Sequence, residues 1–518
     1  MRSLAYHTSL PGLLRLRRAL FPWTLAFATG LDYYDNTLFS FFTSYIAGGI
    51  NSSPDELVWA TSAYAVAAVL GILQQQWWVE RIGFRRYIVG CLLFYAVASL
   101  GAAMCESSLE LAVVRGFQGY FLGPMMGTCR ILLQIRFTAQ QRAPATRAFL
   151  LLLLLGTAMA PLAGGILVSY FGWSALFACS APAAVLYAVA AMFTVPDIGY
   201  TEVNDRTSAN FWPYILFAFA QAALQIVTQQ VRFELFSANP ELLVLMLAGI
   251  GSLVWFAWQQ WHHPNPLVRL TALRLKSYRT GLVLFIFYYY ETTTFSYLIS
   301  RFLEGGLNYP VENAGRLVGL TSMISPIAMV IYMRYAKLIK QKKLIIVPGF
   351  VMAAFAAFWM TRMSPDASQA WLLPALMVRG LLMMFIIMPV AGLTFRVFEL
   401  EEYTHSYRLK NIVRQLTFSF ATATVIIVEQ HRLALHRTRL VETINPYNPQ
   451  FQQMLSALTR GFEAAGQLPQ AAHGLALVRI SQWVEQQASF MSSLDGFRFL
   501  IIVAVCGGIF AAWQKQIN

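Results

Sequence analysis

Apolar runs of about 20 residues recur along almost the whole chain, and this pattern constrains the fold more than any other feature. A helix of that length spans about 30 Å, the thickness of the hydrocarbon core of a bilayer. A backbone in lipid must satisfy its own hydrogen bonds, which leaves helices or a closed barrel. The runs are continuous and do not alternate, so they predict helices. We therefore expect an all-α polytopic membrane protein.

The composition agrees with a membrane protein and leaves two interpretations of the charge. The chain is 57% hydrophobic and only 12% charged, whereas soluble proteins carry about 25% charged residues. The net charge of +14 would suit either a nucleic-acid-binding surface or the positive-inside bias of a membrane protein. The five cysteines form no CxxC pair, so neither a disulfide framework nor a metal site is expected.

Fourteen apolar segments are predicted to cross the membrane, and an even number puts both termini on one side. The first run follows a basic start but is too long for a secretory signal, so we expect it to be retained. The predicted spans are 20–46, 57–77, 87–104, 109–135, 148–168, 174–195, 211–230, 241–261, 280–302, 314–333, 344–362, 371–394, 409–429 and 496–513.

The distribution of Lys and Arg chooses the orientation. The segments on the side of the termini hold most of the basic residues outside the spans, including the cluster at 334–343. The short loops on the other side hold only Arg232 and Arg362. The long segment 430–495 carries more, but long loops contribute little to this bias. Both termini are therefore predicted to be cytoplasmic, with 1–19 as a cytoplasmic N-terminal segment, and nucleic-acid binding is not expected.

The segment 430–495 is the one sizeable polar stretch. It has helical spacing, as in "HRLALHRTRLVETINPYNPQFQQMLSALTRGF". About 65 residues is small for an independent domain. We therefore expect a helical flap over the outer, periplasmic face.

The loop after the second span, "QWWVERIGFRRYI", combines an acid, bases and a turn glycine. Glu80, Arg81, Gly83 and Arg85 would lie at the inner membrane face. The pattern resembles the major facilitator signature G-x-L-x-D-R-x-G-R-K, in which the acid helps to hold neighbouring helix ends together. Gln76 stands where the signature has its first glycine. An ordinary positive-inside loop is the alternative.

The fourth span, "LAVVRGFQGYFLGPMMG", places an arginine within the membrane. Arg115, Gln118 and Gly119 share one helix face. An arginine in a span costs roughly 2.5–3.5 kcal/mol on insertion scales, so it needs a partner or a wet cavity. The R-x-x-Q-G pattern resembles the fourth-span signature of the same superfamily. A purely structural arginine paired with a carboxylate is the alternative.

The fifth span, "GTAMAPLAGG", repeats small residues every four positions. Gly156, Ala160 and Gly164 would let a second helix approach closely, beside Pro161 and Gly165. The whole pattern resembles the antiporter signature G-x-x-x-G-P-x-x-G-G, which importers of the superfamily usually lack. A generic packing face would explain the glycines alone.

Further motifs extend the resemblance over nearly all of the chain. "DNTLFSFFTSYIAG" matches a first-span signature at Asp35 and Thr37. "VRGLLMMFIIMP" and "RQLTFSFATA" place Arg379 and Arg414 in the twelfth and thirteenth spans. The chain therefore resembles the fourteen-span drug:proton antiporter family of the major facilitator superfamily, the EmrB/QacA group.

This resemblance implies a major facilitator fold. Residues 20–195 would form a six-helix bundle, 196–279 two inserted spans with their linkers, and 280–518 a second six-helix bundle that includes the periplasmic segment 430–495. Members of the family lie in the bacterial inner membrane and export organic compounds in exchange for protons. Members with a long outer segment often work with a periplasmic adaptor protein and an outer-membrane channel.

Two carboxylates three residues apart, in "GLDYYDNTLF", are the main candidates for a proton site. Counting about 1.5 Å per residue places Asp35 about 21 Å into the span, at the same depth as Arg115. Asp32 and Glu291 fall near the midplane and are second candidates. A buried carboxylate that alternately meets and leaves an arginine can carry a proton. The alternative is a fixed Asp35–Arg115 ion pair, with Glu291 as a satisfied polar residue.

The sequence therefore predicts a proton-coupled secondary transporter that exports drugs or other organic compounds by alternating access. Neither enzymatic activity nor a cofactor is expected, and no ATP-binding G-x-x-x-x-G-K-[ST] loop is present. The expected partners are a small organic substrate, protons, the lipid bilayer and, by resemblance, an adaptor and an outer-membrane channel. A dedicated exporter of an endogenous metabolite, such as a siderophore or fatty acid, is one alternative. A transport-dead membrane sensor or scaffold is the alternative from another class.

Overall fold

Most of the residues that the structure describes are helical in this computed structural model. The structure describes residues 11–515 apart from 54–55, 138, 198–210, 231–239, 264–265, 340, 396–397, 399 and 443, and no strand occurs among the residues described. Arg232 of the predicted outer loop lies outside the described residues, as does most of the linker predicted between the sixth and seventh spans.

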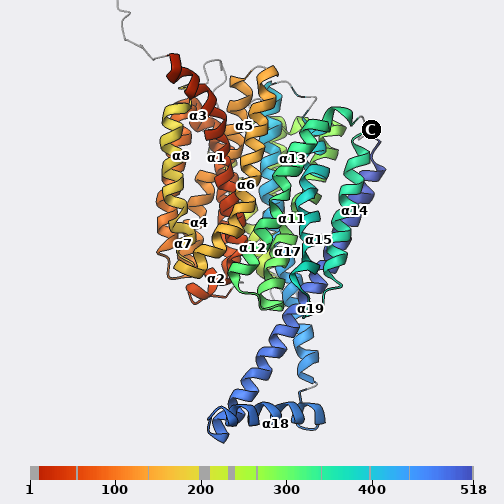
Figure 1. Ribbon diagram of the computed structural model, residues 1–518. Helices are drawn as coiled ribbons and strands as arrows, with labels where there is room; N and C mark the ends of the chain where they lie inside the picture. The colour runs from red at the N-terminus through yellow and green to blue at the C-terminus, as the bar shows by residue number, and fades with distance from the viewer. Residues whose placement is uncertain are drawn as a thin grey trace, which may run out of the picture.

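The N-terminal group of helices covers the first six predicted spans and is coloured red to yellow in Figure 1. Two predicted spans merge in the longest helix of this group, and they meet at Gly83, whose φ of 80° is open to glycine but strained for other residues. The helices are α1 (Pro11–Phe41), α2 (Thr43–Gly49), α3 (Leu57–Ala103), α4 (Ser108–Leu122), α5 (Met125–Arg136), α6 (Ala139–Phe171), α7 (Ala175–Ala178) and α8 (Ser180–Thr194).

Two helices, α9 (Trp212–Gln230) and α10 (Pro240–His262), lie between the groups in sequence and pack against each other. Helix α9 also contacts α3 and α17, so it touches both groups. Most of the apolar face of α10 is exposed, as expected for a helix at the lipid-facing periphery.

The C-terminal group is coloured green to blue in Figure 1. Its α-helices are α11 (Lys276–Arg301), α12 (Val311–Ser322), α13 (Ile324–Tyr335), α14 (Lys343–Met360), α15 (Gln369–Leu382), α16 (Met388–Thr394), α17 (Leu400–Glu442), α18 (Pro449–Ala464) and α19 (Pro469–Trp513). Short 3₁₀ or π segments are η1 (Leu270–Arg274), η2 (Phe302–Gly306), η3 (Ala336–Leu338) and η4 (Met383–Ile387).

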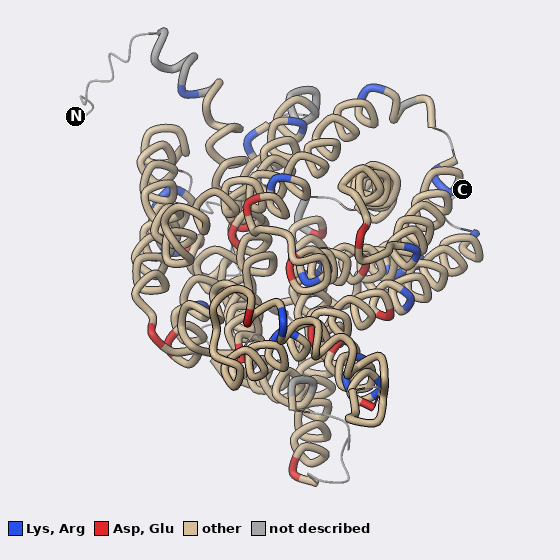
Figure 2. The backbone as a smooth tube through the Cα atoms, turned by 60° about the horizontal axis from the view of Figure 1, so that its bottom comes forward, with Lys and Arg blue, Asp and Glu red and all other residues tan. Residues whose placement is uncertain are grey.

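The helices form a multi-pass membrane protein. Within the described residues, nine helices are long and apolar enough to cross a bilayer, and one of them, α3, holds two predicted spans. Figure 2 shows Lys, Arg, Asp and Glu as scattered positions on an otherwise uncharged backbone. The count of fourteen spans and the boundaries of the two bundles stay predictions.

The polar segment 430–495 is helical, but it does not lie as a flap over the body. Helices α17 and α19 continue beyond the membrane-spanning part and project away from it, with α18 across their tip (Figure 1). Asp495 of α19 joins the two at the base, through His436 at 2.8 Å and Arg432 at 3.7 Å. We call α18 and the adjoining ends of α17 and α19 the hairpin. Both described chain ends lie at the opposite face.

The fifth-span glycines lie where helices touch. A Cβ on Gly156 of α6 would come within 2.5 Å of the Gly30 carbonyl oxygen of α1. On the C-terminal group, a Cβ on Gly315 of α12 would clash with the Pro161 carbonyl oxygen. Gly164 faces the Phe42 ring, and Gly165 faces the backbone of α12. The small-residue pattern therefore serves two contacts, one with α1 and one between the two groups.

We expect Gly156→Ala to destabilise the protein, because the new methyl group meets backbone that cannot move aside. Overpacking of this kind costs about 1–3 kcal/mol. The matched control is Gly90→Ala in α3, where a Cβ meets nothing within 4 Å. Thermal unfolding of the purified protein should show a lower Tm for Gly156→Ala and an unchanged or higher one for Gly90→Ala. Equal Tm values would contradict the close approach of α6 and α1.

Candidate functional site

Helix α1 carries a buried ion pair with α4. The Asp35 and Arg115 side chains lie 2.6 Å apart, and each is only 1% exposed. Tyr95 donates a hydrogen bond to the other Asp35 oxygen at 2.8 Å. The guanidinium also lies over the rings of Phe39 and Tyr64, at 4.3 and 4.4 Å from their centroids. The contact agrees with the equal depths calculated from the sequence.

One turn earlier on the same helix, Asp32 pairs with the C-terminal group. Arg414 of α17 lies 2.9 Å from one oxygen of the fully buried Asp32 carboxylate. Tyr64 and Asn36 donate hydrogen bonds to the other oxygen, at 2.8 and 2.9 Å. The Arg414 guanidinium stacks over Tyr33 at 4.8 Å. The two carboxylates of α1 therefore hold arginines from different groups, one within the N-terminal group and one across the interface.

The fourth-span motif supports the first pair. Gln118 accepts a hydrogen bond from Arg115 at 2.8 Å and donates one to Ser99 at 2.9 Å, which fixes the guanidinium. A Cβ on Gly119 would clash with the Tyr64 carbonyl oxygen, so glycine lets α4 lie directly against α3. Arginine, glutamine and glycine each have a separate part in positioning the ion pair.

The loop motif ties helix ends together at the face of the chain termini. Arg85 donates a hydrogen bond to the Val195 carbonyl oxygen at the end of α8, at 2.7 Å. Glu80 accepts one from Gln76 at 2.7 Å. Gln76 also accepts a hydrogen bond from Arg408 of α17 at 2.5 Å. Gln76, one of the residues that depart from the family signature, thus contacts the C-terminal group.

Arg81 has a local part. It donates a hydrogen bond to the Trp77 carbonyl oxygen at 3.1 Å, and its guanidinium lies 3.9 Å from the centroid of the Trp77 ring. It therefore covers the end of the second predicted span.

The two groups also touch near the hairpin face. Ser300 of α11 donates a hydrogen bond to the Phe41 carbonyl oxygen at 2.6 Å, and Arg301 donates one to Ser44 at 3.3 Å. Arg301 also forms an ion pair with Glu429 of α17, at 3.0 Å. Contacts between the groups therefore exist on both sides of the buried ion pairs.

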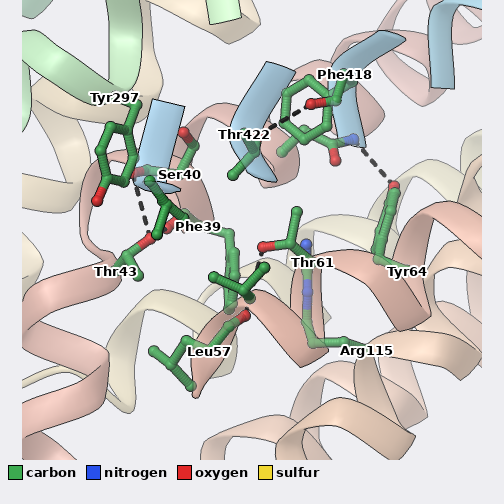
Figure 3. Close-up of a pocket in the computed structure, with 13 residues that line it drawn as sticks. Phe39, Ser40, Thr43, Leu57, Thr61, Tyr64, Arg115, Tyr297, Phe418 and Thr422 are labelled. Carbon is green, nitrogen blue, oxygen red and sulfur yellow. Dashed lines mark hydrogen bonds between the residues drawn. The ribbon is translucent and has the colours of Figure 1, made fainter. Parts of the chain in front are cut away.

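A small cavity lies at the interface between the two groups of helices. Figure 3 shows side chains from both groups around it, among them Arg115 and Tyr64 from the N-terminal group and Phe418 and Thr422 from α17. Its volume is about 20 Å³, room for about one water molecule. An organic molecule would therefore need the groups to move apart.

The structure does not bring Glu291 and Arg379 to the two ion pairs. Glu291 of α11 is 1% exposed, and neither of its oxygens has a hydrogen-bond partner among the described residues. Arg379 of α15 donates a hydrogen bond to Ser296 at 2.5 Å. In the part of the chain that the structure describes, no three His, Cys, Asp or Glu side chains gather in a way that could hold a metal ion.

Sequence reasoning missed several residues of this interface. Tyr64, Tyr95 and Asn36 look like ordinary span residues in the sequence, and nothing in their spacing singles them out. Arg414 was identified by its motif but without its partner, 382 positions away. Lys410, one turn before Arg414, is a further buried cation of α17.

Two groups of membrane helices that meet around buried charges have the architecture of a transporter. Residues 25–422 match the profile of the Major Facilitator Superfamily, and the chain belongs to this family. The fold is similar to that of a bacterial homologue of the human lysosomal transporter Spinster in an inward-facing, occupied conformation. That similarity has a TM-score of 0.60 at 13% identity, over 97% of this chain and 98% of the other.

Two relatives match over most of their length. The multidrug export protein EmrB of Escherichia coli (strain K12) is 22% identical over 467 residues, which cover 89% of this chain and 88% of the relative. The fatty acid resistance protein FarB of Neisseria gonorrhoeae is 20% identical over 459 residues, or 87% and 89% of the two chains.

We expect Arg115→Gln to destabilise the protein strongly, because it leaves the Asp35 carboxylate buried without a cation. Breaking a buried pair in this way costs about 3–5 kcal/mol. The double variant Asp35→Asn/Arg115→Gln should recover most of that loss. The control is Arg316→Gln, which breaks a 2.6 Å pair with Glu312 on the exposed surface and should cost about 0–1 kcal/mol. Thermal unfolding measures all three; equal losses in Arg115→Gln and Arg316→Gln would contradict the assignment.

Proposed function

We propose that the protein is a proton-coupled secondary transporter that exports drugs or other organic compounds across the bacterial inner membrane by alternating access. The observation that carries this proposal is the division of the α1 carboxylates between arginines of the two groups. Membership of the superfamily and the similarity to EmrB support it. The process needs no covalent step, so we infer a transporter and not an enzyme.

Asp32 is our first candidate for the carboxylate that couples proton movement to conformational change. Its partner Arg414 belongs to the other group, so motion of the groups separates this pair. A lone carboxylate in a membrane is costly as an anion, and taking up a proton removes that cost. Asp35, the first candidate from the sequence, pairs within its own group. Rigid motion of that group leaves its pair intact.

Glu291 is the second candidate for proton transfer. It is buried in α11 of the C-terminal group with no hydrogen-bond partner among the described residues. An ionisable residue inside a membrane is a functional candidate by default, because its burial is otherwise unfavourable. A proton that crosses 100 mV supplies about 2.3 kcal/mol, and a pH gradient adds to this.

A dedicated exporter of fatty acids is a second candidate function. The similarity to FarB, named for fatty acid resistance, favours it over other endogenous metabolites. It would use the same mechanism and differ only in the range of substrates.

We further propose that the hairpin projects into the periplasm, with both termini in the cytoplasm. Lys343, at the start of α14, donates a hydrogen bond to the Gln514 carbonyl oxygen at 3.4 Å, near the described C-terminal end and on the side opposite to the hairpin, as the positive-inside rule requires. The hairpin then stands where a periplasmic adaptor, and through it an outer-membrane channel, could dock.

Purified protein in liposomes should move protons only when a transported compound is present. We expect Asp32→Asn to lower this substrate-dependent proton flux by about tenfold or more, the change that 1.4 kcal/mol produces. Substrate binding should persist, because asparagine keeps the shape of aspartate. Asp35→Asn and Glu291→Gln test the other two acids in the same assay.

Two results would count against the mechanism. If the wild-type protein moves compounds without moving protons, transport is not coupled to protons. Proton flux that survives in Asp32→Asn but not in Glu291→Gln would transfer the coupling role to α11.

The role of the hairpin can be separated from transport. Deleting about 440–485 with a short linker should abolish export across the whole cell envelope, because the adaptor loses its docking site. Transport by the same variant in liposomes should persist, since the ion pairs lie outside the deletion. Equal loss of both activities would instead make the hairpin part of the transport core.

A further inference from the structure

Lys410 is a buried cation that the proposed coupling mechanism does not use. It lies on α17, is 3% exposed, and hydrogen-bonds to the side-chain oxygen of Asn411 at 3.3 Å. Its ammonium lies 5.1 Å from the centroid of the Tyr407 ring and 5.5 Å from those of Phe285 and Tyr289. Among the described residues no carboxylate forms an ion pair with it. Cation–π contacts with aromatic rings offset only part of the free-energy cost of burying a cation.

The charge around Lys410 is unbalanced. Arg414, Arg130 and Asp32 act electrostatically on its amino group, so three basic side chains lie near one carboxylate. Asp32 is already paired with Arg414. Arg130 reaches Thr146 and Tyr403, both neutral partners, at 2.9 and 3.2 Å. An unbalanced positive cluster within a membrane is costly, and a bound anion would remove that cost.

The same side of α17 also has an excess of hydrogen-bond donors. Asn411 Nδ2, Arg414 Nε and Gln415 Nε2 are buried and have no hydrogen-bond partner within the described part of the chain. With Lys410 they occupy positions i, i+1, i+4 and i+5, which share one helix face. Buried donors normally find an acceptor. The cluster therefore lacks negative charge and hydrogen-bond acceptors, and an anionic group would supply both.

This cluster lies on α17 just before the residues of the same helix that line the interface cavity. Phe418, Thr422 and Ile426 of α17 line the cavity, and four-residue steps back along the helix lead to Arg414 and Lys410. This line of α17 side chains therefore joins two regions. The cavity end is apolar and lined by hydroxyl groups, and the Lys410 end is basic and surrounded by aromatic rings. A ligand that fits both ends has an apolar body and an anionic head.

We propose that Lys410, with Asn411 and Arg414, forms the binding site for the anionic head group of the substrate, and that the preferred substrates are amphipathic organic acids. This inference rests on the proposed export function and specifies its substrate class. The aromatic rings around Lys410 would hold the part of the acid next to its head group.

Paired probes test this charge preference directly. We would use 1-naphthaleneacetate against 1-naphthylmethylammonium, and laurate against laurylammonium, because each pair has a similar apolar body and opposite charge. Binding is measured by the ligand-dependent rise in Tm of the purified protein, and transport by proton flux in liposomes. Wild type should bind each acid at least about tenfold more tightly than its amine, as expected for a charge-assisted hydrogen bond.

The key variant is Lys410→Met, with Lys410→Arg as the conservative variant. Lys410→Met should lose the rise in Tm with the acids, keep any response to the amines, and be at least as stable as wild type without ligand. Lys410→Arg should restore the acid response. The surface variant Arg316→Gln should behave as wild type. A lysine with only a structural role would instead give a less stable Lys410→Met protein.

Each outcome has a distinct meaning. Absence of binding by all four probes, equal binding of acids and amines, or acid binding that survives in Lys410→Met would overturn the anion site. Acid-selective, Lys410-dependent binding without any proton flux would support the site and contradict the proposed export function. Proton flux with amines alone would support proton coupling and overturn the substrate class.

Discussion

The structure depends on the cost of burying charge in a membrane. Helix α1 carries two carboxylates, and each is acceptable there only because an arginine neutralises it. The Asp35–Arg115 pair fixes α1 to α4 within one group of helices. The Asp32–Arg414 pair, one turn away, fixes the same helix to α17 of the other group. One pair thus lies within a group of helices and the other crosses the interface, three residues apart on the same helix.

The other contacts between the two groups are close backbone packing and a few hydrogen bonds. The glycines of α6 and α12 allow a close backbone contact with few side chains to rearrange. Hydrogen bonds from Arg408 to Gln76 and from Ser300 to Phe41 close the interface toward its two faces. A hydrogen bond of this kind contributes about 0.5–3 kcal/mol, whereas breaking a buried ion pair costs about 3–5 kcal/mol.

Much of the fold could be predicted from the sequence, because bilayer thickness and hydrogen bonding leave few choices for apolar runs. The equal depths of Asp35 and Arg115 suggested that they meet, and the structure has this contact. The Asp32–Arg414 pair did not, since counting residues gives the depth of a side chain and not the direction in which it points. Lys410 was missed for a similar reason: at the end of a predicted span it resembles a loop cation. At the base of the hairpin, Asp495 of α19 contacts Arg432 and His436 of α17, and no local sequence pattern predicts which residues meet there.

The central claim is that the Asp32–Arg414 pair holds the two groups in their present relation. Distances between spin labels on exposed positions of the two groups, Leu109 of α4 and Gln369 of α15, measure that relation directly in a background without the native cysteines. We expect Asp32→Asn and Arg414→Gln each to shift or broaden the distance distribution relative to wild type, while the surface variant Arg316→Gln leaves it unchanged. Identical distributions in all four proteins would contradict the account.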